Sequence, residues 1–276
     1  MQHAHSSSTR RLATTVLIIL VIVFSSCSST TGIEEESDSL YQVSMLNALM
    51  LGDYDGFVTL RELSTKGNLG IGTFDGLDGE MIFLDGVMYK ALHTGAVEQQ
   101  PMDETTPFAV ATDFTRDFGL ETTALFKDIE AFKEQLDTLV ESNSADFNCF
   151  YAATITGTFS MVHVRSVPPQ EKPYKPLSQI AATQPEYIYE DIEGTIVAFR
   201  SPEYVDKINL PGWHLHFISE DKSKGGHLLN ATMQGGTFAL DEIREFEMVL
   251  PDRESFASMA VATDLQAQTV KVEGKE

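Results

Sequence analysis

Residues 212–227 read GWHLHFISEDKSKGGH, and this stretch holds three of the chain's seven histidines. His214 and His216 are two positions apart, so on a β-strand both imidazoles project from the same face. The residues around the pair are aromatic or apolar, which favours a strand. The polar, glycine-rich residues 219–226 then predict a tight reversal that brings His227 back beside the first two. We therefore expect three imidazoles to converge on a β-hairpin.

These histidines have the character of a metal site. Three imidazoles at three corners of a tetrahedron, with the fourth corner open, form the ligand arrangement of a catalytic zinc ion. A histidine on an apolar strand is more often simply packed in the core or exposed at the surface. Three histidines within fourteen positions are a concentrated use of a scarce residue, which favours the metal. The sequence thus predicts a Zn²⁺ site formed by His214, His216 and His227.

Composition limits the class of protein. A chain of 276 residues forms one large domain or two of ordinary size, and 42% hydrophobic residues are enough for a substantial core. The formal net charge of −22 argues against nucleic acid as a partner and against electrostatic binding to anionic lipid. It says little about the substrate, because a metal and one arginine can make a local positive site.

The first residues have the pattern of an export signal. Arg10 and Arg11 precede an apolar run over residues 12–24, which is too short to span a bilayer comfortably. Small residues then lead to Cys27, as in the lipobox of a bacterial lipoprotein signal, where the cysteine becomes the lipidated first residue. Ordinary signal cleavage with secretion, or an uncleaved anchor, are the alternatives.

We accordingly expect a signal peptide over residues 1–27 and a flexible acidic tether over 28–39. The protein would be exported to the cell envelope and would contact the membrane only through the lipid on Cys27. Cys149 is the other cysteine, so no intramolecular disulfide would remain in the mature protein.

Periodicity predicts both helices and strands. Apolar residues at helical spacing predict amphipathic helices over residues 40–51 and 122–142. Runs rich in β-formers, separated in part by Asp-Gly turn pairs, predict strands. These strands lie at residues 69–74, 81–84, 87–92, 107–114, 150–165 and 195–201. The expected fold class is α/β, in the mixed α+β sense, with mixed β-sheets.

Residues 167–176 contain four prolines in ten positions, which is typical of an extended connector. This run predicts a boundary between an N-terminal α/β domain over residues 40–166 and a C-terminal zinc-binding domain over residues 167–276. The last residues, 269–276, are polar and would normally fray.

The chain resembles bacterial α-acetolactate decarboxylase over most of residues 40 to 250. The matching stretches are LYQVSMLNALMLGDYDGFVTL, GNLGIGTFDGLDGEMIFLDGVMYKA, TPFAVATDF, VRSVPPQEKPYKPL, EGTIVAFRSPEYVDKINLPGWHLHFISEDKSKGGH and the short C-terminal VEG. The resemblance implies a two-domain homodimer that converts 2-acetolactate to acetoin and CO2 without oxidation, within acetoin and butanediol biosynthesis. It also implies a zinc ion that chelates the hydroxyl and ketone oxygens of the substrate and stabilises an enediolate.

The resemblance further assigns roles to single residues. The three histidines become the zinc ligands, while Glu80, Arg165 and Glu273 become the catalytic residues and Thr73 lines the pocket with Arg165. The planar guanidinium of Arg165 suits the substrate carboxylate or the enediolate oxygens. Glu80, Glu273 or a polarised water could protonate the carbon, and the sequence does not rank them. Without the resemblance, Glu80 would be interpreted as a solvated turn carboxylate.

Two other functions are compatible with parts of the sequence. His214-x-His216 followed by Glu220 copies half of the first metal motif of the cupins, although Ile208 stands where that motif has a glycine. A non-enzymatic surface lipoprotein that binds a metal or a ligand is the second alternative. A turnover assay separates this last possibility from both enzymes.

Overall fold

The computed structural model describes Met1 and residues 39–273. The expected signal peptide, its Cys27 and the tether up to residue 38 lie outside the described residues. Among the helices of the described part, none is long and apolar enough to cross a membrane.

The first of two large sheets has seven strands in the order β14-β1-β8-β3-β4-β5-β6. All neighbouring strands are antiparallel except β1 and β14, which run parallel. The β4–β5 turn has positive φ at both Asp85 and Gly86, as a two-residue hairpin turn requires. The strands are β1 (Ser39–Val43), β3 (Leu69–Thr73), β4 (Glu80–Leu84), β5 (Val87–Ala91), β6 (Val97–Gln99), β8 (Ala109–Thr112) and β14 (Glu245–Val249). A small separate sheet pairs β2 (Val58–Thr59) with β7 (Thr105–Thr106).

The second large sheet has five strands in the order β10-β11-β12-β13-β9. Strand β13 also pairs with β10, so four of the strands close into a ring of antiparallel pairs. Strand β9 extends the sheet beside β13. The bounds are β9 (Phe118–Phe126), β10 (Phe150–Arg165), β11 (Glu186–Ser201), β12 (Gly212–Ser219) and β13 (Gly225–Ile243).

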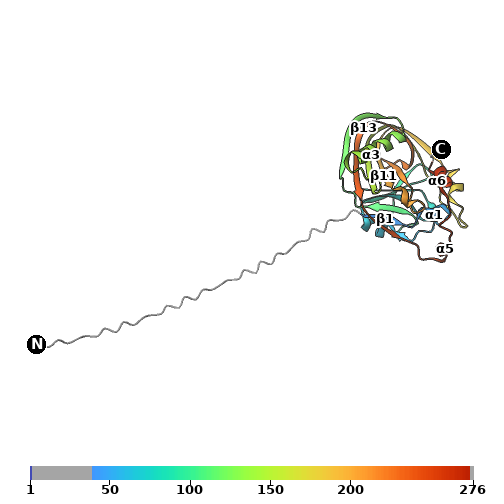
Figure 1. The fold of residues 1–276 in the computed structure, drawn as a ribbon. Helices are drawn as coiled ribbons and strands as arrows, with labels where there is room; N and C mark the ends of the chain where they lie inside the picture. Colours follow the sequence, from blue (N-terminus) through green and yellow to red (C-terminus); the bar gives the residue numbers. More distant parts are fainter. Residues whose placement is uncertain (2–38, 274–276) are drawn as a thin grey trace. The chain divides into compact units, whose positions relative to one another are not determined.

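Alternation along these strands decides which side chains reach the functional site. In Figure 1, helix α3 (Ile129–Asn143) lies over this sheet, and it buries Phe132, Leu136, Leu139 and Val140 against it. Trp213, Leu215 and Phe217 of β12 belong to the same core. The intervening residues of β12 therefore project from the opposite face, toward the seven-stranded sheet.

Short helices from distant parts of the chain make a smaller apolar cluster. Helices α1 (Leu46–Met50), α4 (Leu177–Ala181) and α6 (Gln266–Val272) contribute to it. Figure 1 shows α1 and α6, from the two ends of the described chain, close together. The buried Asn47 side chain donates to the Val261 and Thr263 carbonyls at 2.7 and 2.8 Å. These bonds fasten the segment that leads into α6 to the rest of the fold.

The remaining helices are α2 (Leu60–Leu63) and α5 (Glu254–Ala257), with short 3₁₀ turns at Ser64–Lys66, Asp75–Leu77 and Glu203–Val205. Thr59 and Glu62 form the capping box of α2, with the Thr59 hydroxyl accepting from the Glu62 amide at 3.1 Å.

Both predicted helices were wrong in their first residues. Residues 39–43 form β1, because this segment pairs with β14 on one side and β8 on the other. Residues 118–126 form β9, and the long helix begins only at Ile129, after Asp128 accepts a hydrogen bond from the Ala131 amide. Leu125, placed by periodicity on the buried face of a helix, is 50% exposed.

The expected boundary at residue 167 does not separate the two sheets. Strand β10, before the boundary, pairs with β11 and β13, which follow it. Strand β1 pairs with β14 near the other end of the chain. The described residues from Ser39 onward accordingly belong to one compact unit, and the proline-rich run connects β10 to α4.

Candidate metal centre

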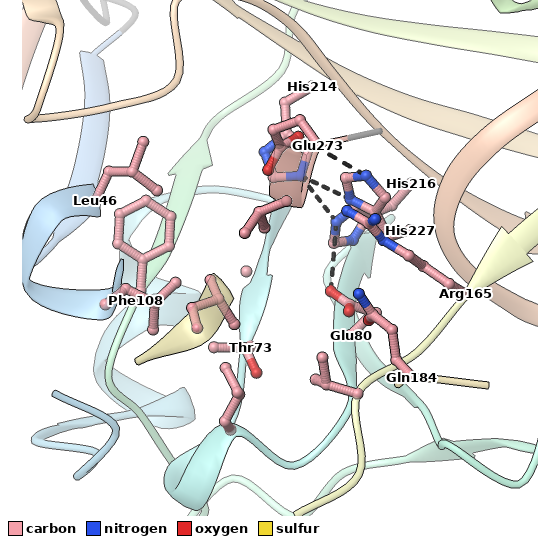
Figure 2. Close-up of a pocket in the computed structure, with 16 residues that line it drawn as sticks. Leu46, Thr73, Glu80, Phe108, Arg165, Gln184, His214, His216, His227 and Glu273 are labelled. Atoms are coloured by element: carbon pink, nitrogen blue, oxygen red, sulfur yellow. Dashed lines mark hydrogen bonds and ion pairs between the residues drawn. The ribbon is translucent and has the colours of Figure 1, made fainter. Parts of the chain in front are cut away.

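The three histidines converge, as their spacing predicts. His214 and His216 alternate with core residues on β12, and His216 lies directly opposite His227 on β13. His214 Nε2 is 3.1 Å from His227 Nδ1 and 3.2 Å from His216 Nε2. One ligand atom from each ring lies within 4.8 Å of the others (Figure 2).

The histidines are suited to a metal in charge as well as in position. Burial is the largest cause that lowers the pKa of His216 well below 6.5, and the charge of the neighbouring His214 is the second. Burial, followed by the charge of Arg165, does the same to the pKa of His227. Both rings are thus neutral at physiological pH and can offer lone pairs. His216 Nδ1 lies 2.8 Å from the Met81 carbonyl, to which it donates, so its Nε2 is left as the acceptor that faces the other rings.

The nitrogen separations also agree with a tetrahedral ion. Two ligands at zinc–nitrogen distances of 2.0–2.1 Å lie about 3.3 Å apart across a tetrahedral angle. The two closest separations here, 3.1 and 3.2 Å, are near that value. The donor set therefore fits a divalent metal such as zinc.

Arg165 completes a row of three functional residues on adjacent strands. It is the last residue of β10 and is paired in register with His227, which is itself paired with His216. Its neighbour Val164 belongs to the core under α3, so Arg165 projects to the same side as the histidines. Arg165 is 8% exposed and forms no ion pair with any carboxylate among residues 39–273. Its guanidinium is available to an anionic ligand.

Glu80 enters the site from the other sheet. It begins β4, and its Oε2 lies 3.7 Å from His216 Nε2. Burial raises the pKa of Glu80 to about 8; Arg165 and a hydrogen bond from the Val167 amide oppose that rise, and Glu273 adds to it. The alternative of a solvated turn carboxylate was therefore wrong.

Glu273 reaches the site from the C-terminal end of α6. Its Oε2 lies 3.7 Å from His227 Nε2, and its side chain is 10% exposed. The preceding Val272 packs in the cluster formed with α1 and α4. The expectation of a frayed end was thus wrong for residues 269–273, because apolar docking orders them. Residues 274–276 lie outside the described part of the chain.

Thr73 lies on β3 directly opposite Glu80 and is 4% exposed. Its hydroxyl donates to the Gly79 carbonyl at 2.7 Å, so its hydrogen is used within the protein. Thr73 therefore lines the pocket wall, as expected, with only acceptor capacity left for a ligand.

These groups surround a pocket that is partly open to solvent. Apolar residues from the short helices and adjoining loops form much of its wall. The apolar residues are Leu46, Leu49, Leu77, Phe108, Val167, Leu177 and Val272. Figure 2 shows Glu80 and Glu273 in different parts of the pocket around the histidines.

Sequence reasoning missed Gln184 and the apolar wall. Gln184 lies between two of the family-like stretches, and no local pattern distinguishes it. The wall residues have helical or core spacing, which indicates burial without indicating a ligand. Conversely, Glu220 is exposed in the β12–β13 turn, so the cupin ligand set is not formed.

A family model described as alpha-acetolactate decarboxylase matches residues 40–263. The chain belongs to the α-acetolactate decarboxylase family. It is 44% identical over 239 residues to the alpha-acetolactate decarboxylase of Methanosarcina mazei, covering 86% of this chain and 81% of that one. It is 40% identical over 218 residues to the alpha-acetolactate decarboxylase of Brevibacillus brevis, covering 79% of this chain and 75% of that one.

Solved structures agree with this assignment to the α-acetolactate decarboxylase family. The crystal structure of alpha-acetolactate decarboxylase from Bacillus subtilis strain 168 superposes with a TM-score of 0.80 at 33% identity, over 86% of this chain and 99% of that one. A Staphylococcus aureus protein, described as of unknown function and similar to alpha-acetolactate decarboxylase, superposes with a TM-score of 0.78 at 32% identity. This match covers 86% of this chain and 100% of that one. The expected mixed α+β fold class is confirmed.

Proposed function

We propose that this enzyme decarboxylates 2-acetolactate to acetoin and CO2, with zinc held by His214, His216 and His227. The observation that carries the proposal is the buried histidine cluster between Arg165 and two carboxylates, in a chain of the acetolactate decarboxylase family. A bound zinc ion would supply Lewis acidity at the substrate oxygens.

Arg165 has the properties needed to bind the substrate carboxylate. It is permanently charged, buried beside the histidines and unpaired with carboxylates in residues 39–273. Loss of CO2 leaves an electron pair on the carbinol carbon, and the adjacent ketone takes it up as negative charge on oxygen. A fixed guanidinium stabilises such charge without reorganising.

Glu80 and Glu273 are the two side chains positioned to deliver a proton to that carbon. Each lies 3.7 Å from a different histidine, so they approach the reacting region from different parts of the pocket. In the metal-free protein the raised pKa of Glu80, about 8, keeps its proton bound at neutral pH. We infer that the choice between the two carboxyls decides which enantiomer of acetoin forms.

The surrounding apolar wall suits the rest of the substrate. Acetolactate carries two methyl groups, which can pack against the leucine and valine side chains of the short helices. The apolar wall also lowers the polarity around the site, which strengthens the electrostatic effects of Arg165 and the carboxyls.

The decisive experiment measures acetoin from racemic acetolactate with purified residues 28–276, first with added zinc and then after chelation and dialysis. Acetoin above the spontaneous background that disappears with zinc and returns on its addition supports the proposal. A folded, zinc-loaded protein that makes no acetoin refutes it and favours a non-enzymatic binding protein.

We further propose that the protein is an exported homodimer, anchored in the cell envelope through lipid on Cys27. The basis is the Arg10-Arg11 and apolar 12–24 pattern for export, and the family for the dimer. Palmitate labelling that persists in Cys27→Ser would contradict the anchor. A monomeric mass for residues 28–276 in sedimentation equilibrium would contradict the dimer.

A further inference from the structure

Gln184 has a buried hydrogen-bond acceptor that no group in the described chain satisfies. Its Oε1 is buried, and no donor among residues 39–273 lies within hydrogen-bond distance of it. Gln184 also lines the pocket, and among the described lining residues no other side chain has such an atom. Buried acceptors are nearly always paired, so an unpaired one inside a pocket indicates a group that a ligand brings.

The structure holds this side chain in a defined position. Its Nε2 donates to the Ala181 carbonyl at the end of α4, at 3.2 Å. The next residue, Pro185, accepts a hydrogen bond from the Ser166 amide at 3.2 Å. Gln184 is therefore fixed between α4 and the end of the strand that carries Arg165. One N–H of the amide is used in this bond, and the oxygen is the end of the amide that no donor among residues 39–273 satisfies.

The chemistry of an amide oxygen limits the group it can bind. It accepts hydrogen bonds and donates none, so a carboxylate or a ketone oxygen cannot pair with it. A hydroxyl can. Figure 2 shows Gln184 pointing into the same part of the pocket as Glu80, near Arg165. A ligand whose carboxylate meets Arg165 could thus present a neighbouring hydroxyl to Gln184.

Building on the proposed function, we propose that Gln184 binds the hydroxyl group of the 2-hydroxy-3-oxo acid. In this position Gln184 makes the pocket bind hydroxy ketones more tightly than ketones without a hydroxyl. The oxygen, left unpaired by the protein, then gains its partner only when a compound with the correct group binds. A site built to pair with a hydroxyl discriminates strongly against an analogue that lacks it.

The test compares two ligands of the same carbon skeleton, acetoin and butanone, which differ by one hydroxyl. Dissociation constants for zinc-loaded wild type, Gln184→Met and Gln184→Ala are measured by NMR titration. Gln184→Met keeps the length of the side chain and removes the amide, while Gln184→Ala leaves space in case methionine disturbs folding. Gln179→Met, at an exposed position of α4, is the matched control.

Wild type and Gln179→Met should bind acetoin more tightly than butanone. In both Gln184 variants this preference should fall about five- to tenfold, the factor expected for one neutral hydrogen bond. Equal weakening of both ligands would show a merely structural role and would overturn the proposal, as would an unchanged preference. Acetoin production by wild type tests the proposed function separately, so failure of the reaction is distinguishable from failure of hydroxyl recognition.

Discussion

Replacing Arg165 by methionine should abolish most of the activity while leaving the metal site intact. The guanidinium is 8% exposed, and no carboxylate in residues 39–273 pairs with it, so its charge is available to the substrate. A unit charge at about 4 Å from the developing negative charge contributes about 4 kcal/mol at an effective dielectric constant of about 20. Loss of a fixed donor to an oxyanion typically costs about 3–4 kcal/mol. We therefore expect kcat/KM to fall about 10²- to 10³-fold.

The assay measures initial rates of acetoin formation together with zinc content and thermal unfolding. Arg165→Lys should recover only part of the loss, because an ammonium lacks the planar pair of donors. Arg200→Met is the matched control, since Arg200 lies in the same sheet, stacks on Phe147 and is absent from the pocket. Arg165→Met with kcat/KM within threefold of wild type would refute the electrostatic role. Loss of zinc along with activity would instead assign Arg165 to assembly of the site.

Four further predictions concern two residues of the site and two residues outside it. His214→Ala removes one of three clustered ligand atoms, so dialysed protein should contain no zinc by atomic absorption; stoichiometric zinc would contradict the assignment. Glu273→Gln should lower kcat about a hundredfold with an unchanged melting temperature, and wild-type kinetics would exclude proton transfer by this residue. Asn47→Ala removes two buried hydrogen bonds and should lower the unfolding free energy by about 2–3 kcal/mol in urea titrations; an unchanged midpoint would show that they contribute nothing. Burial, followed by the hydrogen bond with Asp146, raises the pKa of Cys149 from 9.0 to about 11. At pH 8 Cys149 should therefore react with iodoacetamide about a hundredfold more slowly in folded than in unfolded protein, and equal rates would contradict this.

Local pattern was sufficient where the partner of a residue is close in sequence. The β4–β5 hairpin with its Asp-Gly turn at residues 85–86 was predicted correctly, because a few adjacent residues satisfy each other's hydrogen bonds. Strand β10 was also predicted correctly, from Phe150 to Arg165, because its long run of β-formers favours a strand even though its partners β11 and β13 are distant in sequence.

Local pattern failed where a distant partner decided the structure. The start of the expected helix over residues 40–51 is a strand because β14 and β8 lie on either side of it. The start of the expected helix over residues 122–142 is a strand because β13 pairs with it. In both segments the apolar residues also fit helical spacing. Pairing with strands that are distant in the sequence therefore decides whether each segment forms a helix or a strand.

The residues of the candidate site also differ in whether local sequence pattern could place them. The spacing of His214, His216 and His227 determined their convergence, because a strand followed by a tight turn needs no other part of the chain to place them on one face. Family resemblance, rather than any local signal, indicated Glu80, Arg165 and Glu273. Only the tertiary structure brought these groups from β4, β10 and α6 to the same pocket, buried Glu80 enough to raise its pKa and left Gln184 with an unpaired oxygen. The physical reason is that burial and electrostatic environment depend on neighbours that are distant in sequence, whereas strand geometry depends on the next few residues.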